Sequence, residues 1–180
     1  DADALIAGRV QLTKDMIEGL NTCQVISSGS VGTDKIDVAA ATEKGIPVTN
    51  VPDTFIEEVA DHALMLLLAT YRRLLSLDHM ARDGRWSQGR PMLNRFPRLF
   101  GMTLGLISFG HVARAVALRA APFGMRILAF DPYVGELSMT RMGVEPVNLN
   151  ELLQRSDVVS MHAPATSETH HMMGPGQFRL

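Results

Sequence analysis

The sequence predicts an α/β protein built on parallel sheets, and three observations support this fold class. Short apolar runs alternate with helical patterns along all 180 residues, an order typical of parallel strands covered by helices. Hydrophobic residues make up 46% of the chain and charged residues 20%, which is the composition of a globular protein with a sizeable core. The net charge is −2, so neither extended disorder nor a general affinity for nucleic acid is expected.

The first 52 residues are expected to form three strands and two helices. One helix is predicted over residues 34–44, because Asp34 can cap its free N–H groups and Gly45 can adopt the left-handed conformation that ends it. Pro52 closes the last strand. The expected strands cover residues 4–7, 24–27 (a strand edge) and 46–50, and the other helix covers residues 13–20.

A long helix is expected to begin at Thr54, where Thr54 and Glu57 have the spacing of a capping box. Apolar residues follow at 3.6-residue spacing, and further apolar residues lie on the opposite side. We therefore predict a helix that is buried on both faces, between two sheets or between two subunits, and that ends near Gly84.

The segment after this helix, residues 82–101, is rich in Arg, Gly and Pro. We interpret it as a solvated connector, and the alternative is a surface for an anion or a partner. Trp86 is expected to anchor the connector rather than to bind a ligand.

From residue 103 the pattern is strand, helix, strand, helix, strand. The strands are expected at residues 103–109, 126–130 and 157–161, and the helices at 111–123, ending near Gly124, and at 148–156. This order is that of the first half of a dinucleotide-binding (Rossmann) fold.

The turn between the first strand and the first helix of this half reads Ser108-Phe109-Gly110-His111-Val112-Ala113. In the G-x-G-x-x-G/A fingerprint, Gly110 lets the backbone approach a pyrophosphate, and the terminal Ala113 lets the helix pack on the strand. The helix N-terminus supplies N–H groups and partial positive charge. Ser108 replaces the first glycine, so its Cβ is expected to strain the turn or crowd the cofactor. We therefore hypothesise that Ser108→Gly tightens NAD binding.

An acidic residue stands at the end of the next strand. Asp131 lies 21 positions after Gly110, close to the spacing at which a carboxylate binds the adenosine ribose hydroxyls. Such a carboxylate repels a 2′-phosphate, so NAD is preferred to NADP. The alternative interpretation is a turn residue before Pro132.

Several segments in this order resemble the D-isomer-specific 2-hydroxyacid dehydrogenases. They are GSVGTDKID (29–37), GIPVTN (45–50), TLGLI (103–107), FDPY (130–133) and SMHAP (160–164). The resemblance covers nearly all of the chain and implies part of a flavodoxin-like substrate domain followed by the first half of a Rossmann domain. Residues 131–133 and 71–73 are also similar to the C-terminal-binding-protein branch, whose animal members are transcriptional corepressors.

The resemblance implies roles for particular residues. The backbone N–H groups of Ser30, Val31 and Gly32 are expected to bind the substrate carboxylate, and Ser28 stands where many relatives have Arg or an aromatic residue. The implied cofactor contacts are Val59 (near the nicotinamide, with Asp61), Ser108, Phe109, Gly110, His111, Val112, Asp131, Pro132, His162, Ala163, Pro164 and Thr169. The family's catalytic Arg, Glu and His are expected beyond Leu180, so no catalytic residue is assigned to this chain.

These observations predict an NAD-dependent oxidoreductase, seen in part, that moves hydride at the CH–OH group of a small D-2-hydroxy acid or 2-keto acid. The alternative is a non-catalytic NAD(H)-sensing dimeric protein of the C-terminal-binding-protein type. We expect residues 1–52 to form a partial substrate domain, 53–101 the interdomain helix and connector, and 102–180 half of the NAD-binding domain. The 180 residues alone are expected to be inactive, and a homodimer is expected.

Other classes of protein and site are not expected. The only cysteine, Cys23, excludes an internal disulfide framework or a cysteine-cluster metal site, and no metal is predicted. The longest purely apolar run, residues 63–69, is far shorter than the roughly 20 residues of a membrane span. With no visible targeting segment, we expect a cytoplasmic protein with neither a membrane nor a nucleic-acid partner.

Overall fold

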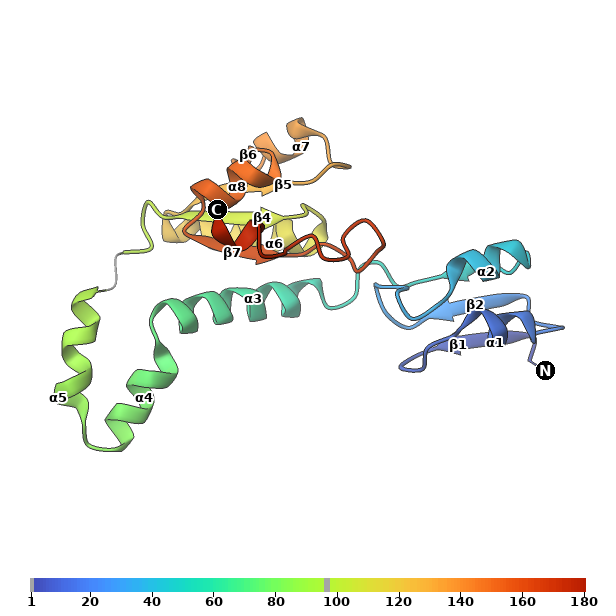
Figure 1. Ribbon diagram of the computed structural model, residues 1–180, viewed down its shortest axis with the longest axis horizontal. Coiled ribbons are helices and arrows are strands. Elements are labelled where there is room, and N and C mark those ends of the chain that lie inside the picture. The colour runs from blue at the N-terminus through green and yellow to red at the C-terminus, as the bar shows by residue number, and fades with distance from the viewer. Residues whose placement is uncertain (1, 96–97) are drawn as a thin grey trace. The chain divides into compact units, whose positions relative to one another are not determined.

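The computed structural model describes residues 2–95 and 98–180. The chain divides into two compact units (Figure 1). Unit 1 comprises the residues up to Thr54 together with Pro164–Met172, and unit 2 comprises Phe55–Ala163 together with Met173–Leu180. Each unit contains its own parallel sheet, which confirms the predicted α/β class. The domain boundaries expected from the sequence remain a prediction.

Unit 1 has a sheet of three parallel strands in the order β1-β2-β3. Residues 24–27, expected to form a strand edge, correspond to β2, which is the middle strand of this sheet. The second helix begins at Val38 and not at residue 34, because the cap is the side chain of Asp37, which accepts the N–H of Ala40 at 2.9 Å. The elements are β1 (Ala4–Ala7), α1 (Lys14–Glu18), β2 (Val25–Ser28), α2 (Val38–Glu43) and β3 (Val48–Thr49).

The long helix expected from residue 54 is two helices, α3 (Ile56–Tyr71) and α4 (Leu74–Arg82). The predicted capping box is wrong, because Phe55 is the residue before the first turn and no side chain caps it. Glu57 pairs instead with Arg119 of another helix. The helix ends early because Arg73 has a φ of 49°, in the left-handed region.

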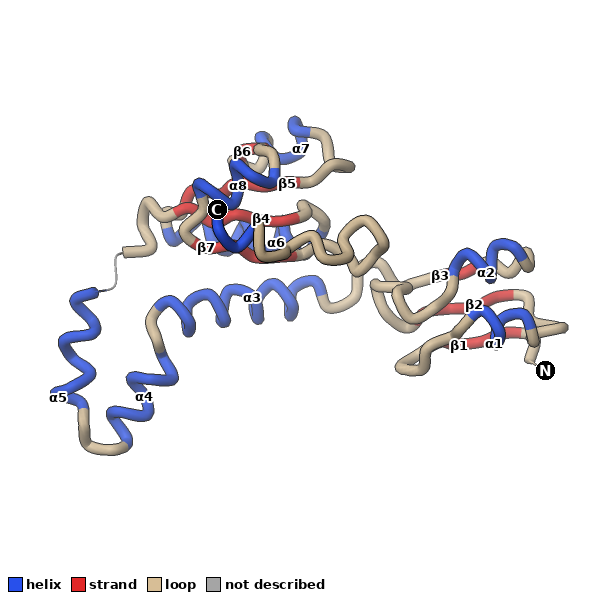
Figure 2. The backbone as a smooth tube through the Cα atoms, viewed as in Figure 1, coloured by secondary structure: helices blue, strands red, loops and turns tan. Residues whose placement is uncertain are grey.

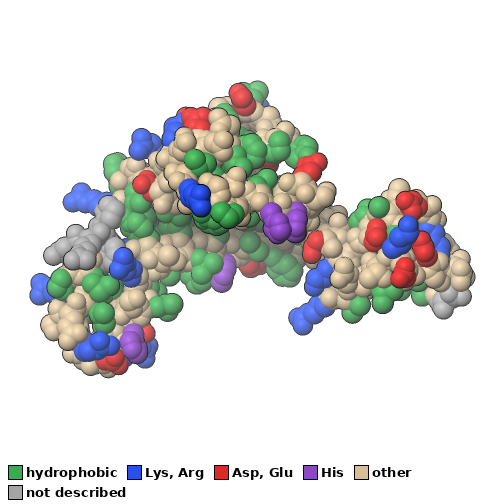
Figure 3. Space-filling model, viewed as in Figure 1, with side chains coloured by type: hydrophobic (Ala, Val, Ile, Leu, Met, Phe, Trp, Pro, Cys, Tyr) green, Lys and Arg blue, Asp and Glu red, His purple; other side chains and the backbone are tan. Residues whose placement is uncertain are grey.

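Within this chain, α3 is not buried between two sheets, because only one of its faces packs against a core. Ala60 is its only fully buried residue, and Ile56, Ala63 and Leu67 pack against the core of unit 2. Met65 is 50% exposed, and apolar side chains are visible at the surface along α3 (Figure 3). A contact with a second subunit stays a prediction.

The expected connector is largely helical rather than an irregular linker. It contains α5 (Trp86–Gly89) and a 3₁₀ segment, η1 (Arg90–Arg95). Trp86 is 48% exposed. Residues 96 and 97 of this segment lie outside the described residues, as does residue 1.

Unit 2 is built on four parallel strands in the order β6-β5-β4-β7 (Figure 2). The three strands and two helices expected here are present, and the sequence pattern missed a short helix and a two-residue strand between β5 and α8. The elements are β4 (Thr103–Ile107), α6 (His111–Ala120), η2 (Ala121–Phe123), β5 (Arg126–Phe130), α7 (Glu136–Thr140), β6 (Glu145–Pro146), α8 (Leu149–Arg155), β7 (Val158–Met161) and η3 (Gln177–Arg179).

Alternate residues of the central strand β4 face different helices. Leu104 and Leu106 are fully buried in a cluster with the apolar residues of α6. Gly105 lies close to α8, where an added Cβ would be 2.2 Å from the Ser156 Oγ and 2.6 Å from a Leu152 methyl carbon. Because side chains alternate between the faces of a strand, α6 and α8 cover opposite faces of the sheet (Figure 1).

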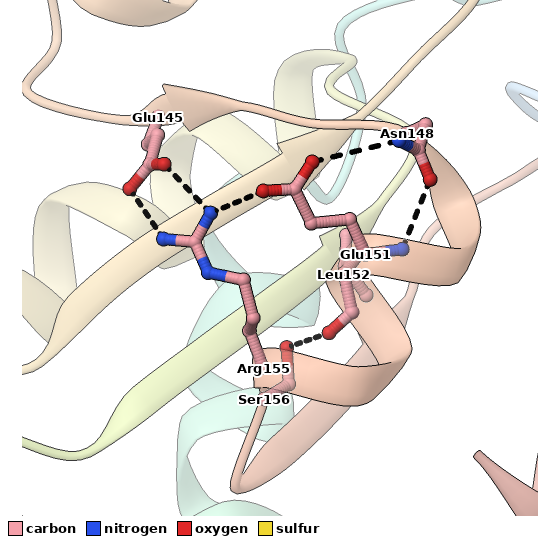
Figure 4. Close-up of polar contacts among 6 residues, drawn as sticks. All are labelled: Glu145, Asn148, Glu151, Leu152, Arg155 and Ser156. Carbon is pink, nitrogen blue, oxygen red and sulfur yellow. Dashed lines mark hydrogen bonds and ion pairs between the residues drawn. The ribbon is translucent and has the colours of Figure 1, made fainter.

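A charged cluster fastens α8 to strand β6 (Figure 4). The two terminal nitrogens of Arg155 donate to the two carboxylate oxygens of Glu145 at 2.8 and 2.9 Å, and one also donates to Glu151 at 2.5 Å. The Asn148 side chain caps α8 by accepting the Glu151 N–H at 2.9 Å. This bidentate geometry holds β6, the edge strand next to β5, against α8.

No helix among the described residues has both the length and the apolar character needed to traverse a bilayer.

Candidate functional site

The strand order of unit 2 changes direction between β4 and β7. From β4 the chain moves outward to β5 and β6, and it then returns to place β7 on the other side of β4. In open parallel sheets, ligands bind at the carboxyl ends of the strands at such a point. The backbone N–H of His162, just after β7, donates to the carbonyl of Ile107 at the end of β4 at 2.8 Å. The two predicted cofactor segments, 108–112 and 162–163, therefore meet at this edge.

The loop after β4 combines a serine in a strained conformation with an open helix N-terminus. Ser108 has a φ of 72°, in the region that favours glycine, and its N–H donates to the Phe130 carbonyl at 2.7 Å. Gly110 precedes α6, and no side chain caps the helix. A Cβ added to Gly110 would meet no atom within 4 Å. The helix N-terminus therefore stays accessible, with the partial positive charge that favours an anion.

The carboxylate of Asp131 is turned toward this loop. One oxygen, Oδ2, accepts the N–H of Phe109 at 2.7 Å and the hydroxyl of Ser108 at 3.1 Å. The other, Oδ1, accepts the N–H groups of Tyr133 at 2.8 Å and Val134 at 3.1 Å. Burial raises the pKa of Asp131, but these hydrogen bonds outweigh it and hold the pKa below its usual value. Asp131 is therefore an anion at neutral pH.

His162 lines the same edge. Its Nε2 lies 2.9 Å from the Ser160 hydroxyl, and burial lowers its pKa, so the ring is neutral at pH 7. A cavity of about 650 Å³ in unit 2 does not include Asp131. It is lined by α3 and β7 and includes His162, together with Val59, His62 and Tyr71. The hydrogen-bonded loop, rather than this cavity, identifies the candidate site.

Four further residues predicted to lie at the cofactor are outside the hydrogen-bonded loop at Asp131, and one of them, Val59, lines the same cavity as His162. Val59 is on α3 and is 47% exposed. The Asp61 carboxylate receives a hydrogen bond from Arg119 Nε at 2.6 Å, so it belongs to an ion pair that joins α3 to α6. Pro164 and Thr169 belong to unit 1, where the Thr169 hydroxyl donates to the Pro164 carbonyl at 2.5 Å. The cofactor contacts of these four residues stay predictions.

The predicted substrate loop of unit 1 has a different construction. Its carbonyls are occupied: the Ser30 hydroxyl donates to the Gly32 carbonyl at 2.8 Å, and Asn50 Nδ2 donates to the Val31 carbonyl at 2.7 Å. Within the described parts of the chain, the backbone N–H groups of Val31 and Gly32 donate to no protein acceptor. The loop lines a pocket of about 290 Å³ that also contains Arg9, Ser28 and Lys35.

Sequence reasoning missed two features of these sites, one beside Asp131 and one in the unit 1 pocket. A serine in a glycine position indicated strain at Ser108, but nothing in the pattern indicated its bond to Asp131. Arg9 lines the unit 1 pocket without belonging to any of the recognised segments, and Lys35 lines it from within the segment 29–37. In the described ranges, no group of three or more His, Cys, Asp or Glu side chains could hold a metal ion.

Comparison with known proteins identifies relatives of most of the chain. Residues 64–180 match the family model described as D-isomer specific 2-hydroxyacid dehydrogenase, NAD binding domain. A glyoxylate reductase of Korarchaeum cryptofilum is 40% identical over 99% of this chain and 54% of the relative. A D-3-phosphoglycerate dehydrogenase of Methanocaldococcus jannaschii is 39% identical over 100% of this chain and 34% of the relative.

A solved structure agrees with these matches. D-lactate dehydrogenase from Aquifex aeolicus, complexed with NAD and lactic acid, has a TM-score of 0.92 and 32% identity over 99% of this chain and 53% of its own chain. The present chain thus spans about half of the length of these relatives, or less.

Proposed function

This chain belongs to the D-isomer specific 2-hydroxyacid dehydrogenase family, and on that premise we propose that it is part of an NAD-dependent oxidoreductase acting on a small D-2-hydroxy acid or 2-keto acid. The observation that carries the proposal is the Asp131 carboxylate, hydrogen-bonded to the loop that leads into the uncapped N-terminus of α6. An anion for ribose hydroxyls beside a donor site for a pyrophosphate is the combination that a dinucleotide requires.

The residues present fit this cofactor. The open space at Gly110 and the first turn of α6, with Phe109, His111 and Val112, suit the pyrophosphate. Asp131, followed by Pro132, suits the adenosine ribose and disfavours a 2′-phosphate. On the β7 side, His162 and Ala163 are assigned to the adenine.

When bound, NAD supplies the hydride chemistry, and the residues of this chain bind and orient. We assign no acid/base step to them. His162 is engaged with Ser160, and the substrate carbonyl is proposed to be protonated by a residue outside residues 1–180. The role of unit 1 is to hold the substrate carboxylate on the N–H groups of Val31 and Gly32, with Ser30 shaping the loop.

The substrate pocket favours a small acid. Ser28 is 4% exposed and donates to the carbonyls of Ser30 and Gly32, so no long or charged side chain reaches the substrate from this position. A pocket of about 290 Å³ suits a two- or three-carbon 2-keto acid such as glyoxylate, the substrate class named for the Korarchaeum cryptofilum relative.

A homodimer is the proposed assembly, because α3 and α4 carry exposed apolar side chains that a second copy would cover: Met65, Leu66, Leu74 and Leu75. A cytoplasmic location is proposed from the free thiol of buried Cys23. The alternative of a non-catalytic NAD(H) sensor draws no support from the relatives reported above, which carry enzyme names.

A titration tests the proposal. NADH and NADPH are added to the 180-residue chain and binding is followed by calorimetry, while NADH oxidation is assayed with glyoxylate, hydroxypyruvate and pyruvate. We expect NADH to bind more tightly than NADPH, without turnover by this chain. The absence of NADH binding would contradict the cofactor assignment, and turnover would contradict the external acid/base residue.

A further inference from the structure

The carboxylate of Asp131 has no spare acceptor site in this fold. A carboxylate offers about four lone-pair positions. Oδ1 is engaged by the Tyr133 and Val134 N–H groups, and Oδ2 by the Phe109 N–H and the Ser108 hydroxyl. A ribose that approaches Asp131 must therefore displace one donor or share an oxygen with it.

Only one of the four donors can leave without moving the backbone. The N–H groups of Phe109, Tyr133 and Val134 are fixed by the course of the chain, whereas the Ser108 hydroxyl turns about a single side-chain bond. Its hydrogen bond is the longest of those on Oδ2, at 3.1 Å against 2.7 Å. The Ser108 hydroxyl is thus the donor that a ribose hydroxyl would exchange with.

Ser108 is also an unusual residue at its position. Its φ of 72° lies in the left-handed region, where a Cβ is disfavoured, and its backbone N–H already donates to the Phe130 carbonyl. Glycine would give the same turn without strain. Serine adds a Cβ and a hydroxyl here, and the hydroxyl donates to the carboxylate assigned to the ribose.

We propose that Ser108 is a specificity-determining residue whose hydroxyl competes with the adenosine ribose for Asp131 Oδ2. This inference rests on the proposed function. When a ribose hydroxyl donates to Oδ2, the Ser108 bond to that oxygen breaks, so the number of hydrogen bonds on the carboxylate does not rise. The affinity for NAD is thereby weakened. The released Ser108 hydroxyl can donate to a 2′-phosphate, which narrows the preference for NAD over NADP.

The test combines two variants with two nucleotides. Ser108→Ala removes the hydroxyl and keeps the Cβ, and Ser108→Gly removes both and relieves the positive φ. ADP carries the two ribose hydroxyls, and 2′,3′-dideoxy-ADP lacks them. Calorimetry on the 180-residue chain gives the dissociation constant of each nucleotide for the wild type and for each variant. A thermodynamic cycle of these constants gives the coupling between Ser108 and the ribose hydroxyls.

Both variants are expected to tighten ADP binding by roughly three- to tenfold, the range of the net contribution of one ordinary hydrogen bond. Neither is expected to change the affinity for 2′,3′-dideoxy-ADP, a contrast that a merely structural effect on the loop would not produce. If the variants change the affinities for ADP and 2′,3′-dideoxy-ADP equally, or if they weaken ADP binding, the proposed competition at Asp131 is refuted and the proposed function stands. If wild-type protein binds neither ADP nor NADH, the proposed function falls and the inference with it. Ser108→Gly keeps the test decisive should Ser108→Ala fail to fold.

Discussion

Two loops of this molecule follow the carboxyl ends of parallel strands, and they present N–H groups by different means. The loop after β2 is shaped by side chains, because Ser28, Ser30 and Asn50 bind its carbonyls, and α2 begins only at Val38. The loop after β4 runs directly into α6, whose open first turn supplies donors and partial charge. Ligand binding at the loop after β2 should therefore depend on its supporting side chains. Ligand binding at the loop after β4 should depend on the open space at Gly110 and on the Asp131 carboxylate.

Removing the Asp131 carboxylate, which binds the loop after β4, should have the largest effect. Asp131→Ala deprives four donors of their acceptor, so we expect unit 2 to lose about 3 kcal/mol of unfolding free energy. NADH binding should weaken by at least roughly tenfold, with a smaller preference over NADPH. Urea unfolding and calorimetric titration measure the two effects.

The matched control for this prediction is another structural aspartate of unit 2. Asp157 accepts the Thr103 N–H at 2.8 Å, at the amino end of β4, away from the cofactor edge. Asp157→Ala should lower stability and leave the NADH dissociation constant unchanged. Equal losses of NADH binding in the two variants would show that Asp131 acts only through folding.

The second-largest effect is expected from filling the open space at Gly110 in the loop after β4. Gly110 has a φ of −74°, which alanine adopts readily, and the added methyl meets no protein atom. Gly110→Ala should therefore keep or slightly raise stability, by up to about 1 kcal/mol. The methyl should occupy cofactor space and weaken NADH binding by roughly tenfold. Unchanged NADH binding would remove Gly110 from the pyrophosphate site.

The same contrast explains what could be predicted from the sequence. In unit 2, β5 was predicted over the residues it occupies, and the turn at Gly110 and the position of Asp131 followed from spacing along a local strand–helix unit. The capping box at Thr54 failed because tertiary contact overrode local pattern, since Glu57 pairs with Arg119. The bond from Ser108 to Asp131 joins residues from two strand ends, and no local pattern encodes it.

Breaking a side-chain support of the first loop should have a moderate effect. Asn50→Ala removes the donor to the Val31 carbonyl, which should reduce stability by about 1 kcal/mol and disorder the N–H groups of Val31 and Gly32. Oxalate, a planar dicarboxylate, is the probe in calorimetry, and its binding should weaken severalfold with NADH binding unaffected. Asn148→Ala is the matched control, because it removes the α8 cap at a similar loss of stability and should leave oxalate binding intact. A similar weakening of oxalate binding in both variants would refute the role of Asn50.

The smallest expected effect is a pH dependence that belongs to the second site. Burial lowers the pKa of His162 in the folded protein, so the unfolded chain takes up a proton at a higher pH than the folded chain does. Where the unfolded state binds more protons, stability rises with pH. The contribution of His162 is thus complete above about pH 6.5 and is lost as the pH falls through its lower folded value. Asp131, whose folded pKa is also lowered, acts in the same direction only below about pH 4.

His162→Asn, which keeps a polar partner for Ser160, should flatten the change in urea midpoint between pH 7.5 and 5.5, and His79→Asn at an exposed position of α4 is the control. A wild-type midpoint that rises on acidification over this range would mean that the imidazole at the β7 edge gains a stabilising charge there. The cofactor edge would then carry a cation at His162 rather than a neutral ring, and the preference for NAD over NADP could no longer be assigned to Asp131 alone.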